Sequence, residues 1–360
     1  MNKRLSLFPM SRDMCAVARY AALLHGYELA HLLVPGYLRM GGDDASRLDG
    51  GTHVGLPLTD YSKDILLECD VIYMDYDETM TSNDLYKEIV THAKEMGVEV
   101  MPSRALRQKL NIIFDNPLAV DDAHHTAAPE KKFLNEINIP VVTVLSHGLF
   151  TDQLAVELAL RQHFIDAGYR VGQIGSHNVC KLLGFTEMPD FMMEPADAYE
   201  KIIRFNKYVS DMVAKDKNEI LIIGAPDAIM KYNDRLLQGH GILPYVVCSA
   251  VRSDVAIACT YYGDYKKGFF DEVSQYCKYH QGSPIHFFNV ANTSAAPDQS
   301  VVQDAIRLIY TNLDSSFVLN AINNITAGEY HLFNVLDRDS AKEACLAVQR
   351  ILSGNASFMR

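Results

Sequence analysis

The sequence predicts an α/β protein with two doubly wound domains, each built around a mostly parallel sheet. Short apolar runs typical of buried strands alternate with helical segments in both halves of the chain. A polar stretch interrupts this alternation, and 360 residues suffice for two domains with separate cores. We therefore expect a Rossmann-like or flavodoxin-like domain over residues 1–110, a linker over 111–139 and a second domain over 140–360.

The composition disfavours nucleic-acid and membrane partners. Lys and Arg number 33 against 45 Asp and Glu, so the formal net charge is −12, and the chain has no long basic run. No apolar stretch approaches the roughly 18 residues that a membrane-spanning helix needs. The seven cysteines are scattered without a C-x-x-C pair, as in proteins whose thiols stay reduced. We expect a cytoplasmic protein.

The first domain alternates strand and helix. The expected strands span residues 4–8, 28–34, 70–75 and 98–101, and the expected helices span residues 14–25, 60–69 and 82–96. A strand–helix–strand opening implies a parallel pair of strands with a right-handed crossover. No G-x-G-x-x-G is present, so the usual signature of a dinucleotide site is missing.

Two polar segments of this domain have both a structural and a functional interpretation. Residues 41–51, GGDDASRLDGG, form a loop that either connects elements at the surface or covers a ligand beside the strand ends. Asp75, Asp77 and Glu78 follow a strand, where they could hold a cation or a substrate amine. Alternatively, Asp77 or a nearby Thr caps the helix that begins near Ser82.

The domain boundary is expected within residues 103–139. Residues 103–111 look helical, and a turn signal and a run of small polar residues follow them. His124 and His125 within this run either lie in a solvated linker or ligate a metal. Neighbouring residues point apart in regular structure, which disfavours joint ligation.

The second domain repeats the alternation and is predicted to be doubly wound as well. The expected strands span residues 141–145, 170–174, 219–223, 255–260 and 285–289, and the expected helices span residues 195–213, 271–279, 298–310 and 339–352. The last two helices are amphipathic and either cover the sheet or bind a partner, so a homo-oligomer stays open.

Residues 140–176 have the layout of a phosphate-binding loop unit: an apolar strand, a tight loop, an amphipathic helix and a second strand. In such a unit backbone N–H groups face an anion at the helix N-terminus, and a lysine just inside the helix neutralises the terminal phosphate. Here residues 146–153 read SHGLFTDQ, with Asp152 before the lysine position and Gln153 at that position. The second domain is therefore predicted to be P-loop-NTPase-like with a degenerate Walker A loop.

Polar side chains follow the expected strands 141–145, 170–174 and 219–223, and in a parallel sheet these strand ends share one rim, where ligands bind. The helix that starts near Thr151 and Asp152 favours an anion through its N–H groups, unless one of these two side chains caps it. The candidate ligand-binding residues are Ser146, His147, Gly148, Thr151, Asp152, Gln153, Ser176, His177 and Asp227. No catalytic residue, cofactor or metal is assigned.

A metal site is a further interpretation of the same rim. His147, His177 and Asp227 supply two imidazoles and a carboxylate, a donor set that suits zinc or iron. Asp227 lies four residues beyond its apolar run, so it is poorly placed for the strand-end aspartate that orients magnesium. A metal-dependent enzyme therefore stays an alternative.

Two long stretches read QLAVELALRQHFIDAGYRVGQIGSHNVCKLLGF and GAPDAIMKYNDRLLQGHGILPYVVCSAVRSDVAIACTYYGDY. They resemble the clostridial peptide maturation system proteins, which are found beside ribosomally made, post-translationally modified peptides (RiPPs). The earlier GGDDASRLDGG and LLECDVIYMD look like the first domain of that family. The resemblance covers most of residues 5–290 and weakens beyond them. More remotely, the second domain is similar to the dethiobiotin-synthetase-like branch of phosphate-loop enzymes.

The resemblance implies a cytoplasmic accessory protein in natural-product peptide biosynthesis that binds a precursor peptide, a radical-SAM maturase or both. It supplies no reaction. Members of that family keep a lysine where this chain has Gln153 and a glycine near Ser146, so nucleotide hydrolysis is disfavoured here. The alternative is a nucleotide- or anion-dependent enzyme of the same pathway, ligase- or transferase-like, in which Lys181 or Arg170 supplies the missing charge.

Overall fold

The computed structural model describes residues 2–77, 79–110, 133–237, 241–298, 307–325 and 327–358. These residues divide into two compact units. The first comprises the described residues of Met1–Asp49, His53–Ala123 and His177–Glu187, and the second comprises those of Gly50–Thr52, His124–Ser176 and Met188–Arg360.

The domain limits 1–110 and 140–360 remain a prediction, and the two compact units differ from them at one segment in particular. Residues His177–Glu187, which come after the phosphate-loop-like stretch in sequence, group with the first unit. The expected linker, with His124 and His125, lies outside the described residues up to position 132.

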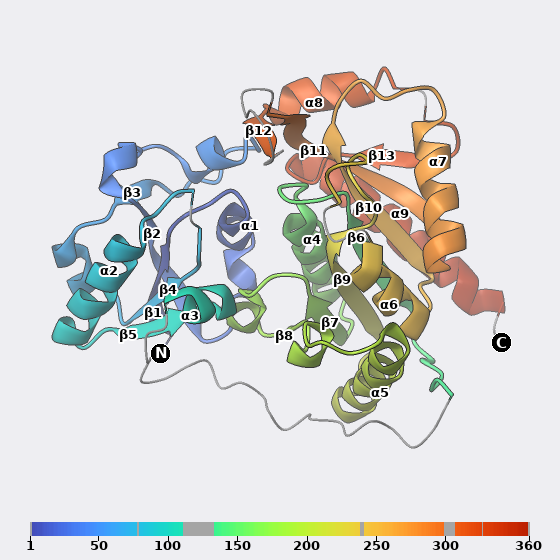
Figure 1. The fold of residues 1–360 in the computed structure, drawn as a ribbon, viewed down its shortest axis with the longest axis horizontal. Helices are drawn as coiled ribbons and strands as arrows, with labels where there is room; N and C mark the ends of the chain where they lie inside the picture. The colour runs from blue at the N-terminus through green and yellow to red at the C-terminus, as the bar shows by residue number, and fades with distance from the viewer. Residues whose placement is uncertain are drawn as a thin grey trace. The chain divides into compact units, whose positions relative to one another are not determined.

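The first unit is a parallel sheet with the strand order β3-β2-β1-β4-β5 (Figure 1). Its elements are β1 (Lys3–Phe8), α1 (Met14–Arg19), β2 (Tyr27–Val34), β3 (Leu58–Asp60), β4 (Val71–Met74), α2 (Asn83–Met96), β5 (Glu99–Pro102), α3 (Arg104–Leu110) and the two-residue β8 (Thr186–Glu187). The strand order reverses between β1 and β4, as in a Rossmann-like half. Tyr86 and Ile89 of α2 pack on Phe8, Ile72 and Met74, and each such burial contributes roughly 1.5–3 kcal/mol.

Two expected helices of this unit are shorter or different in type. The predicted helix 14–25 ends as α1 at Arg19, and a 3-10 turn, Ala21–Leu23, follows it. The predicted helix 60–69 is wrong in type: Lys63–Glu68 form 3-10 turns, of which only Leu66 is buried. Leu66 and Cys69 are nevertheless buried in the hydrophobic cluster of this unit, and Tyr61 and Ile65 pack against it.

The glycine- and aspartate-rich loop 41–51 is organised by its own carboxylate. Asp44 accepts hydrogen bonds from the backbone N–H groups of Ser46 at 3.0 Å, Val54 at 3.0 Å and Gly55 at 2.8 Å. Burial alone would raise the pKa of Asp44, but these hydrogen bonds outweigh it and hold that pKa well below the usual range. The Asp44 carboxylate thus stabilises the loop itself.

The acidic cluster after β4 forms a turn. Asp77 Oδ1 accepts hydrogen bonds from the backbone N–H groups of Thr79 at 2.9 Å and Met80 at 3.1 Å. The N-cap of α2 is Ser82, whose hydroxyl accepts from the N–H of Leu85 at 3.3 Å, so a cap by Asp77 or a Thr is wrong. Glu78 lies outside the described residues.

The second unit is a mostly parallel sheet with the strand order β12-β11-β10-β6-β9-β7, and β13 also pairs with β11 (Figure 1). The strands are β6 (Val141–Ser146), β7 (Val171–Gly175), β9 (Ile220–Ala228), β10 (Val255–Tyr262), β11 (Ile285–Pro297), β12 (Leu308–Asn312) and β13 (His331–Phe333). The helices are α4 (Gln153–Asp166), α5 (Ala198–Asp216), α6 (Ile242–Ala250), α7 (Phe269–Tyr276), α8 (Ser315–Ile322) and α9 (Arg338–Phe358). Only the β11–β12 pair is antiparallel among the pairings described.

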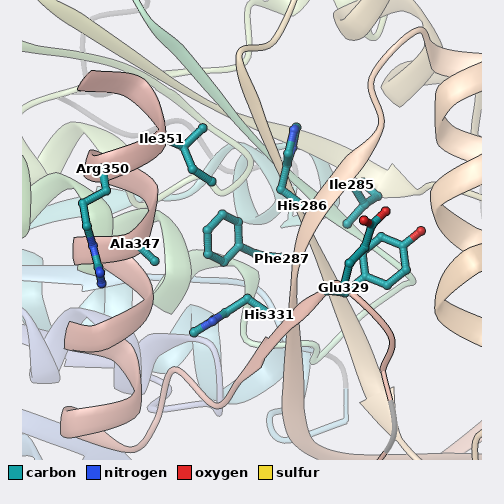
Figure 2. A pocket seen from close by; sticks show the side chains of 9 residues that line it. Ile285, His286, Phe287, Glu329, His331, Ala347, Arg350 and Ile351 are labelled. Carbon is teal, nitrogen blue, oxygen red and sulfur yellow. The ribbon is translucent and has the colours of Figure 1, made fainter. Parts of the chain in front are cut away.

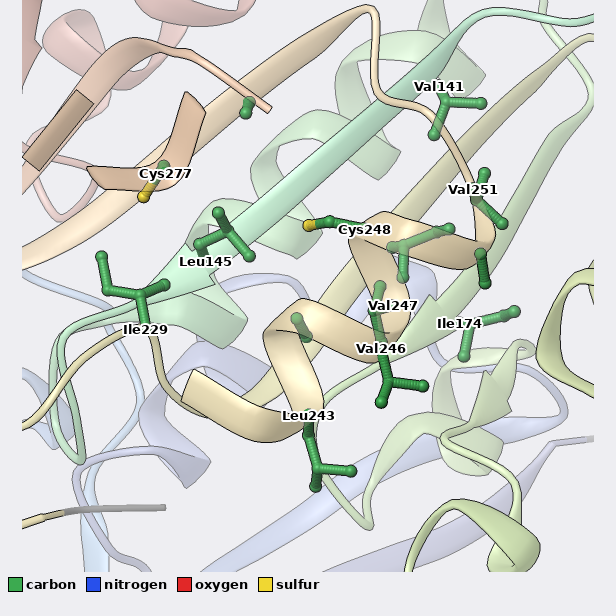
Figure 3. Close-up of a cluster of buried hydrophobic side chains, with 14 of the residues drawn as sticks. Val141, Leu145, Ile174, Ile229, Leu243, Val246, Val247, Cys248, Val251 and Cys277 are labelled. Atoms are coloured by element: carbon green, nitrogen blue, oxygen red, sulfur yellow. The ribbon is translucent and has the colours of Figure 1, made fainter. Parts of the chain in front are cut away.

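Helices cover both faces of this sheet, so the predicted α/β class with doubly wound, mostly parallel sheets is confirmed. On one face α6 packs its Val246 and Val247 with Leu145 of β6 and Ile174 of β7 (Figure 3). Helices α4 and α9 pack together and contact the sheet at β9 and β10. None of the described helices combines the length and apolar character that crossing a membrane requires.

Two expectations for this unit are wrong. The predicted helix 298–310 ends in a strand, because Leu308–Tyr310 belong to β12, and residues 299–306 lie outside the described residues. Helix α4 is not amphipathic in its first turns, where every residue from Gln153 to Leu160 is buried. This helix is covered on all sides there, so its sequence could not show a solvent face.

Candidate functional site

The carboxyl ends of three parallel strands place most of the candidate residues on one rim of the second unit. Ser146 ends β6, Ser176 follows β7, and Asp227 is the penultimate residue of β9. His177 belongs instead to the first unit, where its Nε2 lies 3.8 Å from Asp13 Oδ2.

Gln153, at the position of the phosphate-loop lysine, is hydrogen-bonded to the sheet. Its Nε2 donates hydrogen bonds to the carbonyl oxygens of Val144 at 3.0 Å and Ala225 at 2.8 Å. The pairing of β6 with β9 shifts here, because Val144 lies opposite Gly224 whereas Ser146 lies opposite Ala228. Such a bulge leaves backbone groups without a ladder partner, and an amide supplies two N–H donors for them. Gln153 thus joins β6 to β9 beneath the loop.

Asp152 has the backbone conformation of a glycine. Its φ of 61° lies in the left-handed region, and phosphate loops carry a glycine at this position. The buried carboxylate accepts a hydrogen bond from the N–H of Asn292 at 3.1 Å and makes no cap bond to α4. Capping by Asp152 is therefore wrong, because its carboxylate bonds to the backbone of β11 and makes no side-chain bond to the first turn of α4.

The remaining loop residues bond to one another. The Ser146 hydroxyl accepts from the N–H of Gly148 at 2.9 Å and lies 2.8 Å from the Thr151 hydroxyl. Thr151 also donates to the carbonyl of Gly148 at 3.1 Å, and the N-cap position of α4 belongs to the next residue, Asp152. These hydrogen bonds link the beginning of the loop to its end.

Polar residues of β11 hold the loop from the other side. Asn289 Nδ2 donates to the carbonyl of Thr151 at 3.0 Å, and the Thr293 hydroxyl donates to the carbonyl of Phe150 at 2.7 Å. Asn334 Nδ2 donates to Asn292 Oδ1 at 2.7 Å and so extends this network. These side chains are buried, and sequence reasoning missed them, although the stretch FFNVANT shows Asn289, Asn292 and Thr293 within an apolar strand.

His147 is a buried imidazole whose two ring nitrogens have no hydrogen-bond partner among the described residues. Its ring packs on Phe269 with 5.8 Å between centroids, and its backbone N–H continues the sheet to the Cys259 carbonyl. Burial lowers the pKa of His147 from 6.5 to about 4, so the ring is neutral at pH 7. It therefore brings no positive charge to the loop.

A second carboxylate lies beneath the rim. Ser176 donates a hydrogen bond to Oε1 of the fully buried Glu157 at 2.6 Å. Glu157 packs against Gly224, where an added Cβ would lie 2.0 Å from that oxygen. Burial, and then the charges of Asp152 and Glu157, raise the pKa of the Cys259 thiol well above its usual value. Sequence reasoning missed Glu157, although a glycine in strand β9 is a signal of close packing.

Two cations are considered as substitutes for the lysine, Arg170 and Lys181. Arg170 precedes the amino end of β7, where it donates to the Lys217 carbonyl at 2.7 Å and lies 3.2 Å from Glu219. It is therefore at the opposite end of the strand from the loop, and Lys181 belongs to the first unit. Within the described ranges no three His, Cys, Asp or Glu side chains are grouped as a metal site requires.

No known family model and no curated protein matches this sequence. Among solved structures, a DUF1611 family protein from Anabaena variabilis is similar with a TM-score of 0.61 at 11% identity, over 97% of this chain and 100% of that one. A nucleotide-binding protein from Archaeoglobus fulgidus, solved with ADP, has a TM-score of 0.29 at 12% identity, over 57% of this chain and 85% of that one. The 54 kDa signal recognition particle protein from Aeropyrum pernix, solved with GDP, has a TM-score of 0.31 at 14% identity, over 64% and 50%.

This chain is similar in fold to the DUF1611 family protein over nearly its whole length. At this identity the likeness concerns the fold, because site residues diverge long before a fold does. The two nucleotide-bound structures are too dissimilar to show a shared site.

Proposed function

We propose that this protein is a cytoplasmic accessory factor in the maturation of a RiPP, which binds the precursor peptide, the radical-SAM maturase or both and does not hydrolyse nucleotides. Support for the pathway is the resemblance of residues 5–290 to the peptide maturation system proteins. The absence of hydrolysis is carried by one observation, the commitment of the Gln153 amide to the Val144 and Ala225 carbonyls.

Electrostatics at the loop supports the same proposal. A triphosphate needs a cation and unengaged N–H groups at the helix start. Here the carboxylate of Asp152 lies at the start of α4, Glu157 is buried below it, and His147 is neutral at pH 7. A carboxylate at the start of a helix disfavours a polyphosphate there, because it repels the negative charge of the phosphates.

Calorimetric titration of the purified protein with ATP and GTP plus magnesium tests the claim that the protein does not use nucleotides. We expect no binding at millimolar nucleotide, with an established nucleotide-binding protein as the control in the same buffer.

Pull-downs and titrations with the precursor peptide and the maturase of the same gene cluster test the proposed binding of these partners. A scrambled peptide of equal charge is the control, and no association with either partner would remove the proposal.

One observation favours the alternative, a nucleotide- or anion-dependent enzyme of ligase or transferase type. The two unpartnered ring nitrogens of His147 are groups that a bound ligand could satisfy. Under this alternative, ATP or GTP with magnesium shifts the nuclear magnetic resonance signals of the His147 ring and binds more weakly to a His147→Phe variant. Unchanged ring signals at saturating nucleotide would exclude it.

A further inference from the structure

A cavity of about 620 Å³ opens at the amino ends of β11 and β13 in the second unit. Its volume lies within the roughly 300–1,000 Å³ of small-molecule sites. Because β6 runs parallel to β10 and β10 to β11, this cavity lies at the opposite end of the sheet from the 146–153 loop. It is therefore independent of the function proposed above. Its lining consists of Ile285, His286, Phe287, Glu329, Tyr330, His331, Ala347, Arg350 and Ile351.

A bulge in β11 places one of the polar groups. Ala256 of β10 lies opposite Ile285 and Ile257 lies opposite Phe287, so His286 is the extra residue between them. His286 Nδ1 accepts a hydrogen bond from the N–H of Ala256 at 3.2 Å, which replaces a ladder bond lost at the bulge. Burial lowers the pKa of His286, and with Nδ1 as acceptor the neutral ring carries its proton on Nε2.

Helix α9 supplies the cation. Ala347, Arg350 and Ile351 are spaced three and four residues apart, so they share one face of the helix, and this face borders the cavity (Figure 2). The Arg350 guanidinium is exposed, and its Nε makes one long bond, 3.3 Å, to the Leu346 carbonyl of the same helix. Among the ion pairs of the described residues none includes Arg350, so its charge is available to a ligand.

An acid lies across from this cation. Figure 2 shows Glu329 on the side of the cavity opposite Arg350, with the buried ring of Phe287 between them. His331 pairs with Phe287 in the sheet, and burial lowers its pKa, with the Arg350 charge lowering it further against the opposing effect of Glu343. The cavity thus has a positive side, an apolar floor and a negative side, with neutral imidazoles in between.

We propose that this cavity binds an elongated zwitterion, a short peptide or an ω-amino acid, whose carboxylate pairs with Arg350, whose apolar body covers Phe287 and whose ammonium group pairs with Glu329. A guanidinium holds a carboxylate through two parallel hydrogen bonds, which fixes the direction of the ligand. An α-amino acid fits less well because its two charges are adjacent. A purely anionic ligand would leave Glu329 facing an apolar end.

Three probes of equal chain length separate these contributions: ε-aminocaproate carries both charges, caproate only the carboxylate and hexylamine only the ammonium group. We expect ε-aminocaproate to bind more tightly than either single-charge probe in calorimetric titrations of the full chain. Its binding should shift the ring signals of His286 and His331 in nuclear magnetic resonance spectra. Equal affinity for all three probes, or unchanged ring signals, would overturn the proposal.

Variants assign each charge. Arg350→Gln should weaken ε-aminocaproate and caproate about tenfold or more, whereas Arg338→Gln, at the start of the same helix and outside the lining, should leave both unchanged. Glu329→Gln should remove the advantage of ε-aminocaproate over caproate. Ala347→Phe fills the cavity and provides a second variant if Arg350→Gln fails to fold. Binding that survives both Arg350→Gln and Ala347→Phe would contradict the assignment.

Discussion

At the scale of the residue, the identity of position 153 determines what the loop can do. A lysine there would bring a mobile charge to a phosphate, whereas the Gln153 amide makes two fixed hydrogen bonds to the backbone of β6 and β9. Asp152 likewise makes a hydrogen bond within the protein, which it accepts from the N–H of Asn292. Both side chains are buried, so replacing either of them should lower the free energy of unfolding.

Gln153→Ala should lower the free energy of unfolding by roughly 2–4 kcal/mol, because it leaves two buried carbonyl oxygens without this donor. Chemical denaturation measures the change. Gln162→Ala on the same helix is the matched control, since the Gln162 amide bonds the Asp166 carboxylate at the surface. Equal effects of the two substitutions would contradict the role given to Gln153.

His147 makes stability depend on pH. Its pKa is lowered to about 4 in the folded protein, so between pH 6.5 and 4 the unfolded chain binds a proton that the folded protein does not. This contribution to stability is present above pH 6.5 and is lost as pH falls. A His147→Phe variant lacks the group and keeps the packing on Phe269. From pH 7 to pH 5 the wild type should lose about 2 kcal/mol more than this variant in denaturant titrations. Parallel losses in the two proteins would contradict a buried neutral ring.

At the scale of the element, the 146–153 loop is held by a strand that is distant in sequence. Asn289, Asn292 and Thr293 of β11 bond to the loop backbone or to Asp152, and Asn334 continues the network behind them. Each of these side chains is buried, and a buried amide is stable only with its partners in place. The loop shape therefore depends on the register of β11.

Asn334→Ala should destabilise the second unit by roughly 2–4 kcal/mol, because the Asn334 side chain bonds to the Val290 carbonyl, to Asn292 Oδ1 and to the N–H of Asp337. Asn324→Ala, which removes an exposed bond to the Asn320 carbonyl, is the control and should cost well under 1 kcal/mol. Denaturation curves followed by circular dichroism compare the two. A small effect at Asn334 would show that water can replace this network.

At the scale of the whole molecule, the cysteines share one environment in the described structure. Each of the seven is buried, and none of them forms a disulfide in the described structure. Burial raises the pKa of the Cys15, Cys248, Cys277 and Cys345 thiols. A thiol that stays protonated and inaccessible does not react as a nucleophile.

Titration with a thiol reagent should therefore label few cysteines in the native protein and all seven in guanidinium chloride. The unfolded protein in the same buffer is its own control for reagent quality. Every cysteine is buried in the folded state. Rapid labelling of several thiols under native conditions would therefore show that the protein unfolds locally on the timescale of the reaction.

The sequence by itself determined the alternation of strands and helices, the phosphate-loop layout of residues 140–176 and the missing charge at Gln153. These properties are local, because hydrophobic periodicity and residue identity are readable within one segment. Only the tertiary structure decided which groups Gln153 and Asp152 bond, that Leu308–Tyr310 form a strand, and that His177 belongs to the first unit. The partners of these buried polar groups are set by strand register and by chain segments as far as 72 and 140 residues away, and no local pattern records either.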